Sequence, residues 1–336
     1  MIREYLSADL QPRNSFRVRQ YAARLVEFDA AADLAELFAG GLPERWMVLG
    51  GGNNILFTQD FDGLLLHPVS REIRVLHDDG NSVVLRVDAG VDWDDLVAWT
   101  VERGLWGLEN LSAIPGTAGA APVQNIGAYG CEAGDAIERV EMFCVESGAM
   151  LTLDQAHCAF GYRDSIFKRS LRGRVVITAI ELRLSRTPAP KLGYGDVERE
   201  VEARGGATLQ NIRAAICAIR AAKLPDPAVT GNAGSFFKNP VVDEAVAAIL
   251  RADWPEMPCY PAAEAGKVKL AAGWLIDRAG MKGFVQGCVG VHDRQALVLV
   301  NRGGATGGEV LELARTVQAR VRERFGIEID TEVNIV

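Results

Sequence analysis

The sequence predicts an α+β fold in which β-hairpins and helices follow one another without a regular βαβ alternation. Two hairpin patterns, in residues 74–87 and 140–153, place short apolar runs on either side of a polar turn. Apolar residues at helical spacing occur separately, most clearly in residues 209–219 and 306–325. Hairpins and separate helices favour an α+β class over a doubly wound parallel sheet.

The composition is that of an ordinary globular protein and disfavours several classes of partner. The 336 residues are 49% hydrophobic and 24% charged, with a formal net charge of -8. Such an acidic chain is a poor ligand for nucleic acid, and no apolar run reaches membrane-spanning length. Residues 1–5 carry no apolar signal segment, so we expect a cytoplasmic protein. The six cysteines and four histidines lack metal-ligand spacing, which predicts reduced thiols and no metal site.

The first segment places three consecutive glycines directly after a strand. Asp29 is the expected N-cap of an alanine- and leucine-rich helix that ends near Gly40, and residues 46–49 form a short buried strand. Glycines 50–52 then expose successive N–H groups, which form an anion-binding nest suited to a pyrophosphate. A structural turn is the alternative, because neither GxGxxG nor a Walker lysine is present and residues 55–57 favour another strand.

A long uncharged loop follows the first hairpin and a helix in residues 92–104, which has acidic residues at its N-terminus. Residues 107–130 contain five glycines, two prolines and almost no charge. Such a loop either packs irregularly or is buried against a ligand. In the second case its small residues let the backbone lie on a flat ring system, and Gln124 and Asn125 bond the polar edge of that ring.

Arg163 lies in the polar stretch 160–168, which precedes a long strand. Its guanidinium is suited to bind a carboxylate in a bidentate fork, and an ion pair with Asp164 in a surface turn is the alternative. Apolar and polar residues alternate in residues 175–185, which predicts a strand with one buried face.

The last third of the chain combines helices with short strands. Helices are predicted in residues 209–223, 243–252, 270–277 and from the capping box at Thr306 to Gly326. Strands are predicted in residues 284–291, 296–300 and 327–336. Pro225 and Pro227 stop the first of these helices and mark a boundary after Lys223.

The decapeptide 231–240 carries a hydroxyl, a cation and an amide on a glycine-bearing backbone. Ser235 precedes two phenylalanines, and Lys238 and Asn239 follow them. Such a backbone can approach a ligand closely, but a tight turn anchored in the core by its phenylalanines explains the same pattern. Glu332 lies on the polar face of the terminal strand, where its spacing alone indicates a solvated carboxylate.

Taken in order, these stretches resemble the UDP-N-acetylenolpyruvoylglucosamine reductase family of flavoenzymes over nearly the full chain. The resemblance rests on residues 14–16, 50–54, 114–116, 124–130, 162–168, 223–225, 231–240 and Glu332. Tyr260 before residues 269–274 is similar to the longer form of the family, which keeps a tyrosine loop over the substrate. The chain departs from the family at Gly51, Asn53 and Asn334, where relatives often carry glutamate, serine and arginine, and at Ser15, where threonine is commoner.

The resemblance implies a FAD-binding unit of the vanillyl-alcohol-oxidase (PCMH) type in two subdomains and a C-terminal α+β substrate-binding domain. The implied bounds are residues 1–67 for subdomain 1, joined by the strand 326–336, residues 68–222 for subdomain 2, and residues 223–325 for the substrate-binding domain. The resemblance also implies bound FAD, with NADPH as reductant. The implied FAD-binding residues are Gly50, Gly51, Gly52, Asn53, Asn54, Ile114, Pro115, Gly116, Gln124, Asn125, Gly127, Ala128 and Tyr129.

The implied reaction is reduction of UDP-N-acetylglucosamine enolpyruvate to UDP-N-acetylmuramate, in peptidoglycan precursor synthesis. It needs a hydride at one carbon of the enolpyruvyl group and a proton at the neighbouring carbon. Arg163 and Glu332 match the family positions that bind and polarise the substrate carboxylate, and Ser235 matches the proton donor. The matching UDP-sugar residues are Tyr194, Arg220, Lys223, Asn239, Tyr260, Lys282 and Gln295.

Two other functions are weighed against this one. Another PCMH-type flavin oxidase would often tether FAD through histidine or cysteine, and no histidine lies in the flavin loops. A non-catalytic UDP-sugar binding protein would not need Arg163, Ser235 and Glu332 intact. We therefore expect a monomer that binds the enolpyruvyl substrate and NADPH, without nucleic acid or membrane as a partner.

Overall fold

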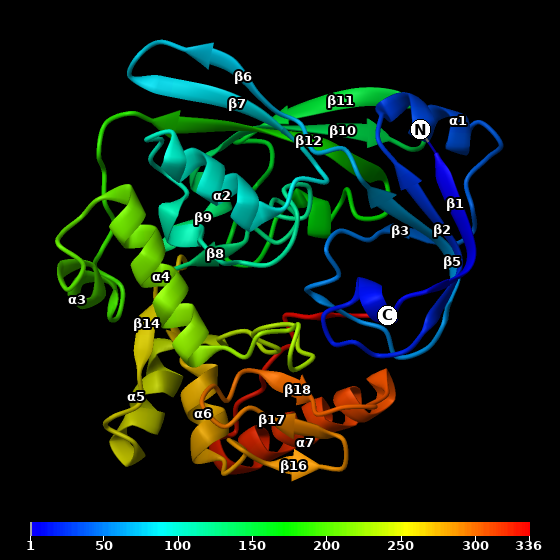
Figure 1. Cartoon of the computed structure of the whole chain (residues 1–336). Coiled ribbons are helices and arrows are strands. Elements are labelled where there is room, and N and C mark those ends of the chain that lie inside the picture. The colour runs from blue at the N-terminus through cyan, green and yellow to red at the C-terminus, as the bar shows by residue number, and fades with distance from the viewer. Residues whose placement is uncertain (1) are drawn as a thin grey trace. The chain divides into compact units, whose positions relative to one another are not determined.

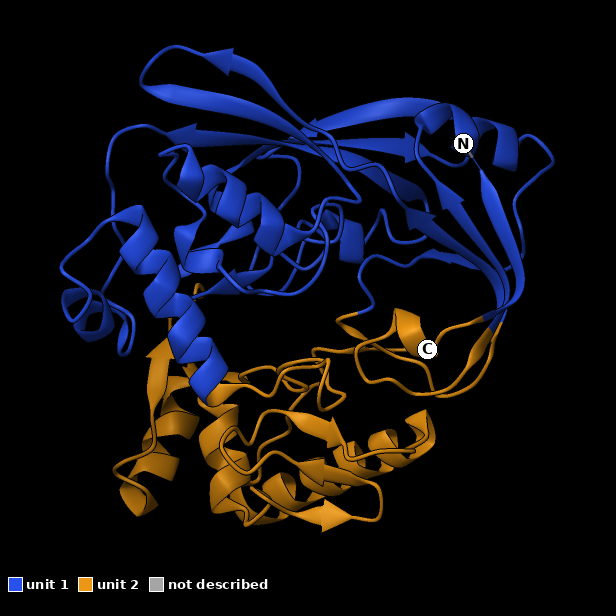
Figure 2. Ribbon diagram, viewed as in Figure 1, with its two compact units in different colours: residues 1–8, 22–52, 62–222 blue, residues 9–21, 53–61, 223–336 orange. Residues whose placement is uncertain are grey.

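The computed structural model describes residues 2–336. The chain divides into two compact units, coloured blue and orange in Figure 2. Unit 1 comprises residues 1–8, 22–52 and 62–222, and unit 2 comprises residues 9–21, 53–61 and 223–336. Both implied FAD-binding subdomains thus fall mainly in unit 1, while two short N-terminal stretches group with the C-terminal part of the chain.

The largest element of unit 1 is a five-stranded antiparallel sheet, with strand order β11-β10-β12-β7-β6 (Figure 1). Its strands are β6 (Ile73–Asp78), β7 (Ser82–Asp88), β10 (Ile137–Cys144), β11 (Ala149–Asp154) and β12 (Val175–Ser185). The two predicted hairpins are confirmed as the pairs β6–β7 and β10–β11. The long strand β12 pairs with both β10 and β7 and so joins the hairpins into one sheet.

Helices α2 (Trp93–Glu102) and α4 (Leu209–Lys223) contribute to the main core of unit 1. Fully buried Trp93 and Ile216 from these helices belong to one cluster with Leu85 and Ile180 from the sheet. The predicted N-terminus of α2 is confirmed, because the Asp92 carboxylate accepts hydrogen bonds from two N–H groups of its first turn. A shorter helix, α3 (Val197–Glu202), precedes α4.

A second sheet of unit 1 has the strand order β1-β2-β5-β3 and packs with helix α1. These elements are β1 (Arg3–Asp9), β2 (Tyr21–Phe28), α1 (Ala31–Phe38), β3 (Trp46–Val48) and β5 (Phe61–Pro68). The stacked rings of Phe38 and Phe143, 6.1 Å apart, join this core to β10 of the large sheet. The expected cap at Asp29 is wrong: Ala30 is the N-cap, and the Asp33 carboxylate accepts hydrogen bonds from the N–H groups of Asp29 and Ala30.

Unit 2 contains two three-stranded sheets and three helices. The sheets have the orders β13-β15-β14 and β16-β17-β18. The elements are β13 (Val241–Asp243), α5 (Glu244–Asp253), β14 (Cys259–Pro261), β15 (Lys267–Leu270), α6 (Ala272–Arg278), β16 (Val285–Gln286), β17 (Val289–Val291), β18 (Leu299–Asn301) and α7 (Gly307–Phe325). The capping box at Thr306 is confirmed, and Gly326 ends α7 in the left-handed conformation.

Three predictions in unit 2 are corrected by the strand pairing in the structure. Helix α6 begins at Ala272 because Leu270 ends strand β15 and pairs with Cys259. Residues 284–291 form the hairpin β16–β17 instead of one strand. The terminal strand is confined to β19 (Asn334–Ile335), which pairs in parallel with β4 (Ile55–Leu56).

The remaining elements are short. They are η1 (Gln11–Arg13), η2 (Glu109–Leu111), β8 (Gly127–Ala128), β9 (Cys131–Glu132), η3 (Ala133–Asp135) and η4 (Ile166–Lys168), where η denotes a 3-10 helix. In residues 2–336 no helix is both long and apolar enough to cross a membrane. The same residues hold no group of three or more potential metal ligands.

Candidate active site

The glycine loop after β3 packs tightly against the uncharged loop of unit 1. A Cβ atom added to Gly50 would lie 2.8 Å from Thr117 Oγ1 and 3.3 Å from Ala120 Cβ. Glycine is therefore required at position 50 by the close approach of a second backbone segment. Gly52 has a φ of +65°, a conformation that glycine adopts without strain. Thr117 Oγ1 is buried and has no hydrogen-bond partner among the described residues, so a donor for a bound group lies beside the glycine loop.

The uncharged loop is held in place by the backbone that leads into α2. Trp93 N–H donates to Gly116 O at 3.0 Å, and Ala118 N–H donates to Val91 O at 2.8 Å. Three non-glycine residues of the loop adopt positive φ angles: Ala113, Asn125 and Tyr129. Such conformations cost of order 1–3 kcal/mol each and cluster at ligand-binding segments. The loop is thus a fixed, locally strained structure rather than a flexible connection.

Asn125 is buried and uses its side chain within unit 1. Its Nδ2 donates to Glu132 Oε2 at 2.6 Å and to Gly161 O at 3.1 Å, and its Oδ1 accepts from Gly134 N–H at 2.8 Å. Both amide hydrogens are thus satisfied by protein. The side chain is expected to bond the edge of a flat ring. The groups of Asn125 that could still form such a bond are the second lone pair of Oδ1 and the backbone. Its neighbour Gln124 is half-buried.

Arg163 occupies a tight turn whose ends are joined by two backbone hydrogen bonds. Gly161 N–H donates to Asp164 O at 3.0 Å, and Asp164 N–H donates to Gly161 O at 3.2 Å. Arg163 has a φ of +54°, where glycine is the favoured residue. Its Nη2 donates to Gly127 O at 2.7 Å. A Cβ atom at Gly127 would lie 3.0 Å from Arg163 Nη1, so the guanidinium rests directly on the Gly127 backbone.

Unit 1 also brings Tyr129, Tyr194 and Arg220 together. The rings of Tyr129 and Tyr194 meet edge to face, with centroids 5.9 Å apart. Arg220 Nε donates to Ala113 O at 3.1 Å. Burial lowers the pKa of the Arg220 guanidinium, although the nearby Tyr129 and Asp94 oppose this shift. Burial also raises the pKa of the Tyr129 phenol, against the effect of Arg220.

Sequence reasoning missed a charged pair next to this group. Asp94 accepts two hydrogen bonds from Arg213, at 2.5 and 2.9 Å, and a third from Ala113 N–H. Burial alone would raise the pKa of Asp94, but these hydrogen bonds outweigh it, and the pKa is lowered. The pair ties α2 to α4 and fixes Ala113, the acceptor of Arg220. The helical positions of both residues carried no signal for this contact.

In unit 2, the segment containing Ser235 lies beside the segment containing Glu332. Glu332 N–H donates to Phe236 O at 2.8 Å, and Lys238 N–H donates to Asp330 O at 2.9 Å. Phe236 and Phe237 are buried, which agrees with the alternative given for residues 231–240, a turn anchored in the core by its phenylalanines. The half-buried Ser235 and Glu332 are thereby carried by adjacent segments of one unit.

The other predicted residues of unit 2 take several separate positions. Asn54 Nδ2 donates to Glu332 O at 3.3 Å, so these two residues are neighbours. Asn239 Oδ1 accepts from Ala272 N–H at 3.0 Å and caps α6. Lys282 forms an exposed ion pair with Asp277 at 3.1 Å. Tyr260 lies on β14, opposite Lys269 of β15, and is 40% exposed.

Gln295 and Lys223 complete the predicted set. Gln295 Oε1 accepts from Leu297 N–H at 3.4 Å and would lie 3.3 Å from a Cβ atom at Gly273, the second residue of α6. Lys223 is exposed and is the last residue of α4. The structure thus places Glu332 next to Asn54 and next to Phe236, the neighbour of Ser235 in the chain, whereas Lys282 forms an ion pair with Asp277.

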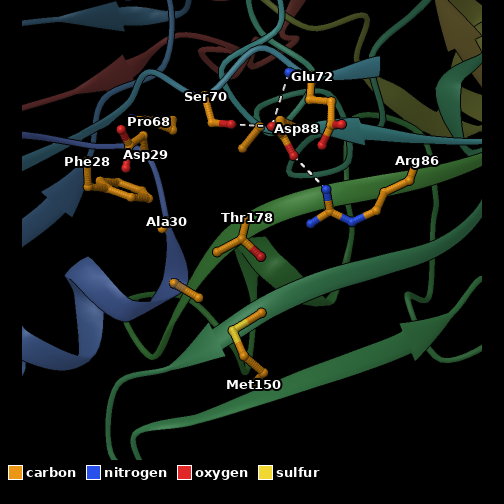
Figure 3. A pocket seen from close by; sticks show the side chains of 12 residues that line it. Phe28, Asp29, Ala30, Pro68, Ser70, Glu72, Arg86, Asp88, Met150 and Thr178 are labelled. Atoms are coloured by element: carbon orange, nitrogen blue, oxygen red, sulfur yellow. Dashed lines mark hydrogen bonds and ion pairs between the residues drawn. The ribbon is translucent and has the colours of Figure 1, made fainter. Parts of the chain in front are cut away.

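A cavity of about 300 Å³ lies in unit 1 and contains none of the predicted site residues (Figure 3). Arg86 and Asp88 in its wall form an ion pair, and Ser70 Oγ–H and Glu72 N–H also donate to the Asp88 carboxylate. Arg86 also donates hydrogen bonds from Nε and Nη2 to the Glu141 carboxylate. Because none of the predicted site residues lines this cavity, it is not the site that the sequence predicts.

Comparison with protein families finds two matching family models. The first, described as the C-terminal domain of UDP-N-acetylenolpyruvoylglucosamine reductase, matches residues 226–336. The second, described as an FAD binding domain, matches residues 23–154. The second match includes both loops that meet at Gly50 and Thr117, as well as Asn125.

Comparison with curated proteins and solved structures finds similarity over nearly the whole chain. A UDP-N-acetylenolpyruvoylglucosamine reductase of Chromobacterium violaceum is 50% identical over 333 residues, which cover 96% of this chain and 96% of the relative. One from Burkholderia orbicola is 50% identical over 331 residues, covering 96% and 94%. The crystal structure of a UDP-N-acetylenolpyruvylglucosamine reductase from Thermus caldophilus has a TM-score of 0.69 and 25% identity, covering 100% of this chain and 98% of that one.

Proposed function

Because this chain belongs to the UDP-N-acetylenolpyruvoylglucosamine reductase family, we propose that Arg163, Ser235 and Glu332 are its catalytic residues. The protein is a flavoprotein oxidoreductase of peptidoglycan precursor synthesis, and it uses FAD and NADPH. The proposed substrate is UDP-N-acetylglucosamine enolpyruvate, which is reduced to UDP-N-acetylmuramate. The observation that carries the catalytic assignment is the pairing of the Ser235 segment with the Glu332 segment, together with the fixed turn of Arg163.

We propose that the glycine loop and the uncharged loop hold FAD, which supplies hydride transfer when it is bound. The residues of this site are Gly50, Gly51, Gly52, Asn53, Asn54, Ile114, Pro115, Gly116, Gln124, Asn125, Gly127, Ala128 and Tyr129. The residues present fit such a group, because Gly50 lacks a side chain where the two loops meet and Thr117 has a buried hydroxyl without a partner. N–H groups of a glycine nest are suited to a pyrophosphate.

Each of the three proposed catalytic residues has a different role toward the substrate. Arg163 binds the substrate carboxylate, since a guanidinium can present two parallel N–H donors to it. Glu332 polarises the same carboxylate, which requires a proton or a bridging partner between the two acids. The carbon next to the carboxylate develops enolate character after hydride arrives at the methylene carbon. Ser235 Oγ–H donates its proton to that carbon; a serine hydroxyl is a weak acid, but a carbanion is strongly basic.

The UDP-sugar is assigned to Tyr194, Arg220, Lys223, Asn239, Tyr260, Lys282 and Gln295. Lysines and arginine suit the diphosphate, and the tyrosines supply apolar faces with a polar tip. The contact of Tyr194 with Tyr129 supports this assignment, because it places a proposed substrate residue next to a proposed FAD residue within unit 1. Tyr260, on the exposed strand β14, is the proposed tyrosine loop of the longer family form.

We propose the following domain bounds, oligomeric state and cellular compartment for the protein. The two FAD-binding subdomains are residues 1–67 with 326–336 and residues 68–222, and the substrate-binding domain is residues 223–325. The active species is a monomer in the cytoplasm, where NADPH is available. Light scattering of the FAD-loaded protein tests the first point, and a dimer would contradict it.

Absorbance of the purified protein tests the function as a whole. We expect a yellow protein whose flavin absorbance bleaches with NADPH and returns when the enolpyruvyl substrate is added. A colourless protein that does not take up added FAD would contradict both the reaction and the loop assignment.

Stopped-flow measurement of the two half-reactions tests Ser235. Ser235→Ala should keep the rate of flavin reduction by NADPH and lose reoxidation by substrate by about 10²–10⁴-fold, the usual contribution of a positioned general acid. Ser235→Cys is the matched control, because it keeps a proton donor of similar size. Equal slowing of both half-reactions in Ser235→Ala would rule out the proton-donor role.

A further inference from the structure

Two buried side chains tie the turn of Arg163 to the backbone on which its guanidinium rests. Ser165 is fully buried, and its Oγ–H donates to Val123 O at 2.6 Å. Asn125 Nδ2 donates to Gly161 O, at the other end of the turn, at 3.1 Å. Arg163 itself donates to Gly127 O at 2.7 Å. All three hydrogen bonds join one segment, residues 161–165, to another, residues 123–127.

The Arg163 turn needs such ties because its backbone is strained. A φ of +54° is costly for any residue with a Cβ atom, and it persists only where the surroundings over-determine it. The guanidinium hydrogen bond to Gly127 O uses one of the five N–H donors and holds the tip of the side chain, so the backbone of the turn needs restraints of its own. Ser165 and Asn125 hold the turn independently of the guanidinium.

We propose that Ser165 is a positioning residue, which fixes the Arg163 turn on residues 123–127 and so sets the guanidinium for the substrate carboxylate. The inference rests on the proposed role of Arg163. Ser165 does not touch the substrate, because its hydroxyl is buried and already bonded. A displacement of about 1 Å at a binding group is enough to slow a reaction by on the order of 100-fold, so loss of one tie has a measurable effect.

A purely structural role for Ser165 must be distinguished from positioning. Ser165 Oγ also accepts from Phe167 N–H at 3.2 Å and caps the short helix η4. A structural cap would lower stability and FAD binding, and it would affect both half-reactions. A positioning residue affects only the step in which Arg163 takes part, and its effect disappears when Arg163 is removed.

The test is a double-mutant cycle on the FAD-loaded protein with Ser165→Ala, Arg163→Ala and the double variant. Stopped-flow absorbance gives the rate of flavin reduction by NADPH and of reoxidation by the enolpyruvyl substrate. We expect Ser165→Ala to slow reoxidation about tenfold or more and to change reduction by less than about twofold. In the Arg163→Ala background, Ser165→Ala should cause no further loss of reoxidation. Multiplicative losses in the double variant, or equal slowing of both half-reactions, would overturn the proposal.

Two further variants guard against general destabilisation. Thr100→Val removes another fully buried hydroxyl of unit 1, which donates to Val97 O at 2.8 Å within α2, and it should leave both half-reactions unchanged. Ser165→Cys keeps the volume of the side chain but weakens the donor, so it replaces Ser165→Ala in the cycle if that variant does not fold.

The cycle also separates failure of this inference from failure of the role of Arg163. If Arg163→Ala slows reoxidation and Ser165→Ala does not, Arg163 keeps its role and Ser165 loses its own. If Arg163→Ala leaves reoxidation unchanged, the proposed role of Arg163 is wrong, and the positioning role of Ser165 is overturned with it.

Discussion

At Arg163 the protein places a long charged side chain on a backbone conformation that glycine would adopt with less strain. The guanidinium lies on Gly127 O, and neighbouring side chains hold the turn from both ends. Strain of this kind is retained where a side chain is needed for function. The arginine at position 163 therefore lowers the stability of the backbone, but it provides a cation in a fixed position.

The strain has a direct test in two truncations that both remove the guanidinium. Arg163→Gly should be more stable than Arg163→Ala by on the order of 1 kcal/mol, because a positive φ strains the backbone of alanine but not that of glycine. Urea unfolding of the two variants measures the difference. At Ala218, exposed in the middle of α4, the order should reverse, and Ala218→Gly should lose roughly 1 kcal/mol. Equal stabilities at position 163 would show that the turn relaxes.

Two buried thiols of unit 1 are chemically inert at neutral pH. Burial raises the pKa of Cys131 to about 11 and that of Cys158 to about 12, above the ordinary value of 9.0. Iodoacetamide at pH 8 should label exposed Cys288 and leave both untouched, as mass spectrometry would show.

The same thiols make stability depend on alkaline pH. The unfolded chain ionises them near pH 9, whereas the folded protein keeps them neutral up to about pH 11. Their contribution is therefore complete below pH 9 and is lost as the pH rises above it. Cys131→Ala should flatten the fall of the melting temperature between pH 9 and 11; an unchanged slope would contradict the shift.

At the scale of elements, α7 is the helix whose start is most completely determined by its own sequence. Thr306 Oγ1 accepts from Glu309 N–H at 3.2 Å, and Glu309 Oε2 accepts from Thr306 N–H at 2.7 Å. These hydrogen bonds satisfy N–H groups that the helix itself cannot. The pKa of Glu309 is lowered by its hydrogen bonds to Thr306.

Removing this cap should destabilise the protein in a way that depends on pH. Thr306→Ala should cost about 1 kcal/mol of unfolding free energy at pH 7. Because the folded-state pKa of Glu309 is depressed, its contribution is present above the unfolded pKa and is lost as the pH falls through the folded one. Thr316→Ala, in the middle of the same helix, is the control and should cost less. Urea titrations at pH 7 and pH 4 compare the variants.

Elements of this kind were predicted from the sequence because their determinants lie within a few residues. The start of α2 after Asp92, the two hairpins and the box at Thr306 all depend on adjacent positions. The start of α6 was misplaced because Leu270 belongs to β15 through its pairing with Cys259. Ser165 was not singled out, since its partner Val123 is 42 residues away. The sequence motifs single out Arg163 and Ser235, but the partners that hold them are distant in sequence and are seen only in the structure.

At the scale of the whole molecule, FAD should behave as a stabilising ligand of the folded chain. With free FAD at 100 times its dissociation constant, the expected gain is about 2.7 kcal/mol. Scanning calorimetry at several FAD concentrations should therefore give a melting temperature that rises with concentration. A melting temperature independent of FAD would contradict binding to the native state.

Gly50→Ala locates that effect in the glycine loop. Its Cβ atom would lie 2.8 Å from Thr117 Oγ1, so the two loops would separate and the FAD-dependent shift should shrink or vanish. Gly40→Ala is the matched control, because a Cβ atom at Gly40 meets nothing within 4 Å. A full shift in Gly50→Ala would place FAD elsewhere.

Unit 2 gathers residues 9–21, 53–61 and 223–336, and this has a consequence for biosynthesis. A ribosome releases the first two stretches long before the third. The ring of Phe16 therefore cannot pack on Phe236, and β4 cannot pair with β19, until the third stretch has been made. The β-hairpins of unit 1 pair neighbours in the chain and have no such delay. The nascent protein therefore exposes incomplete edges in residues 9–21 and 53–61 until residues 223–336 have been made, which makes these two stretches the expected binding sites for chaperones.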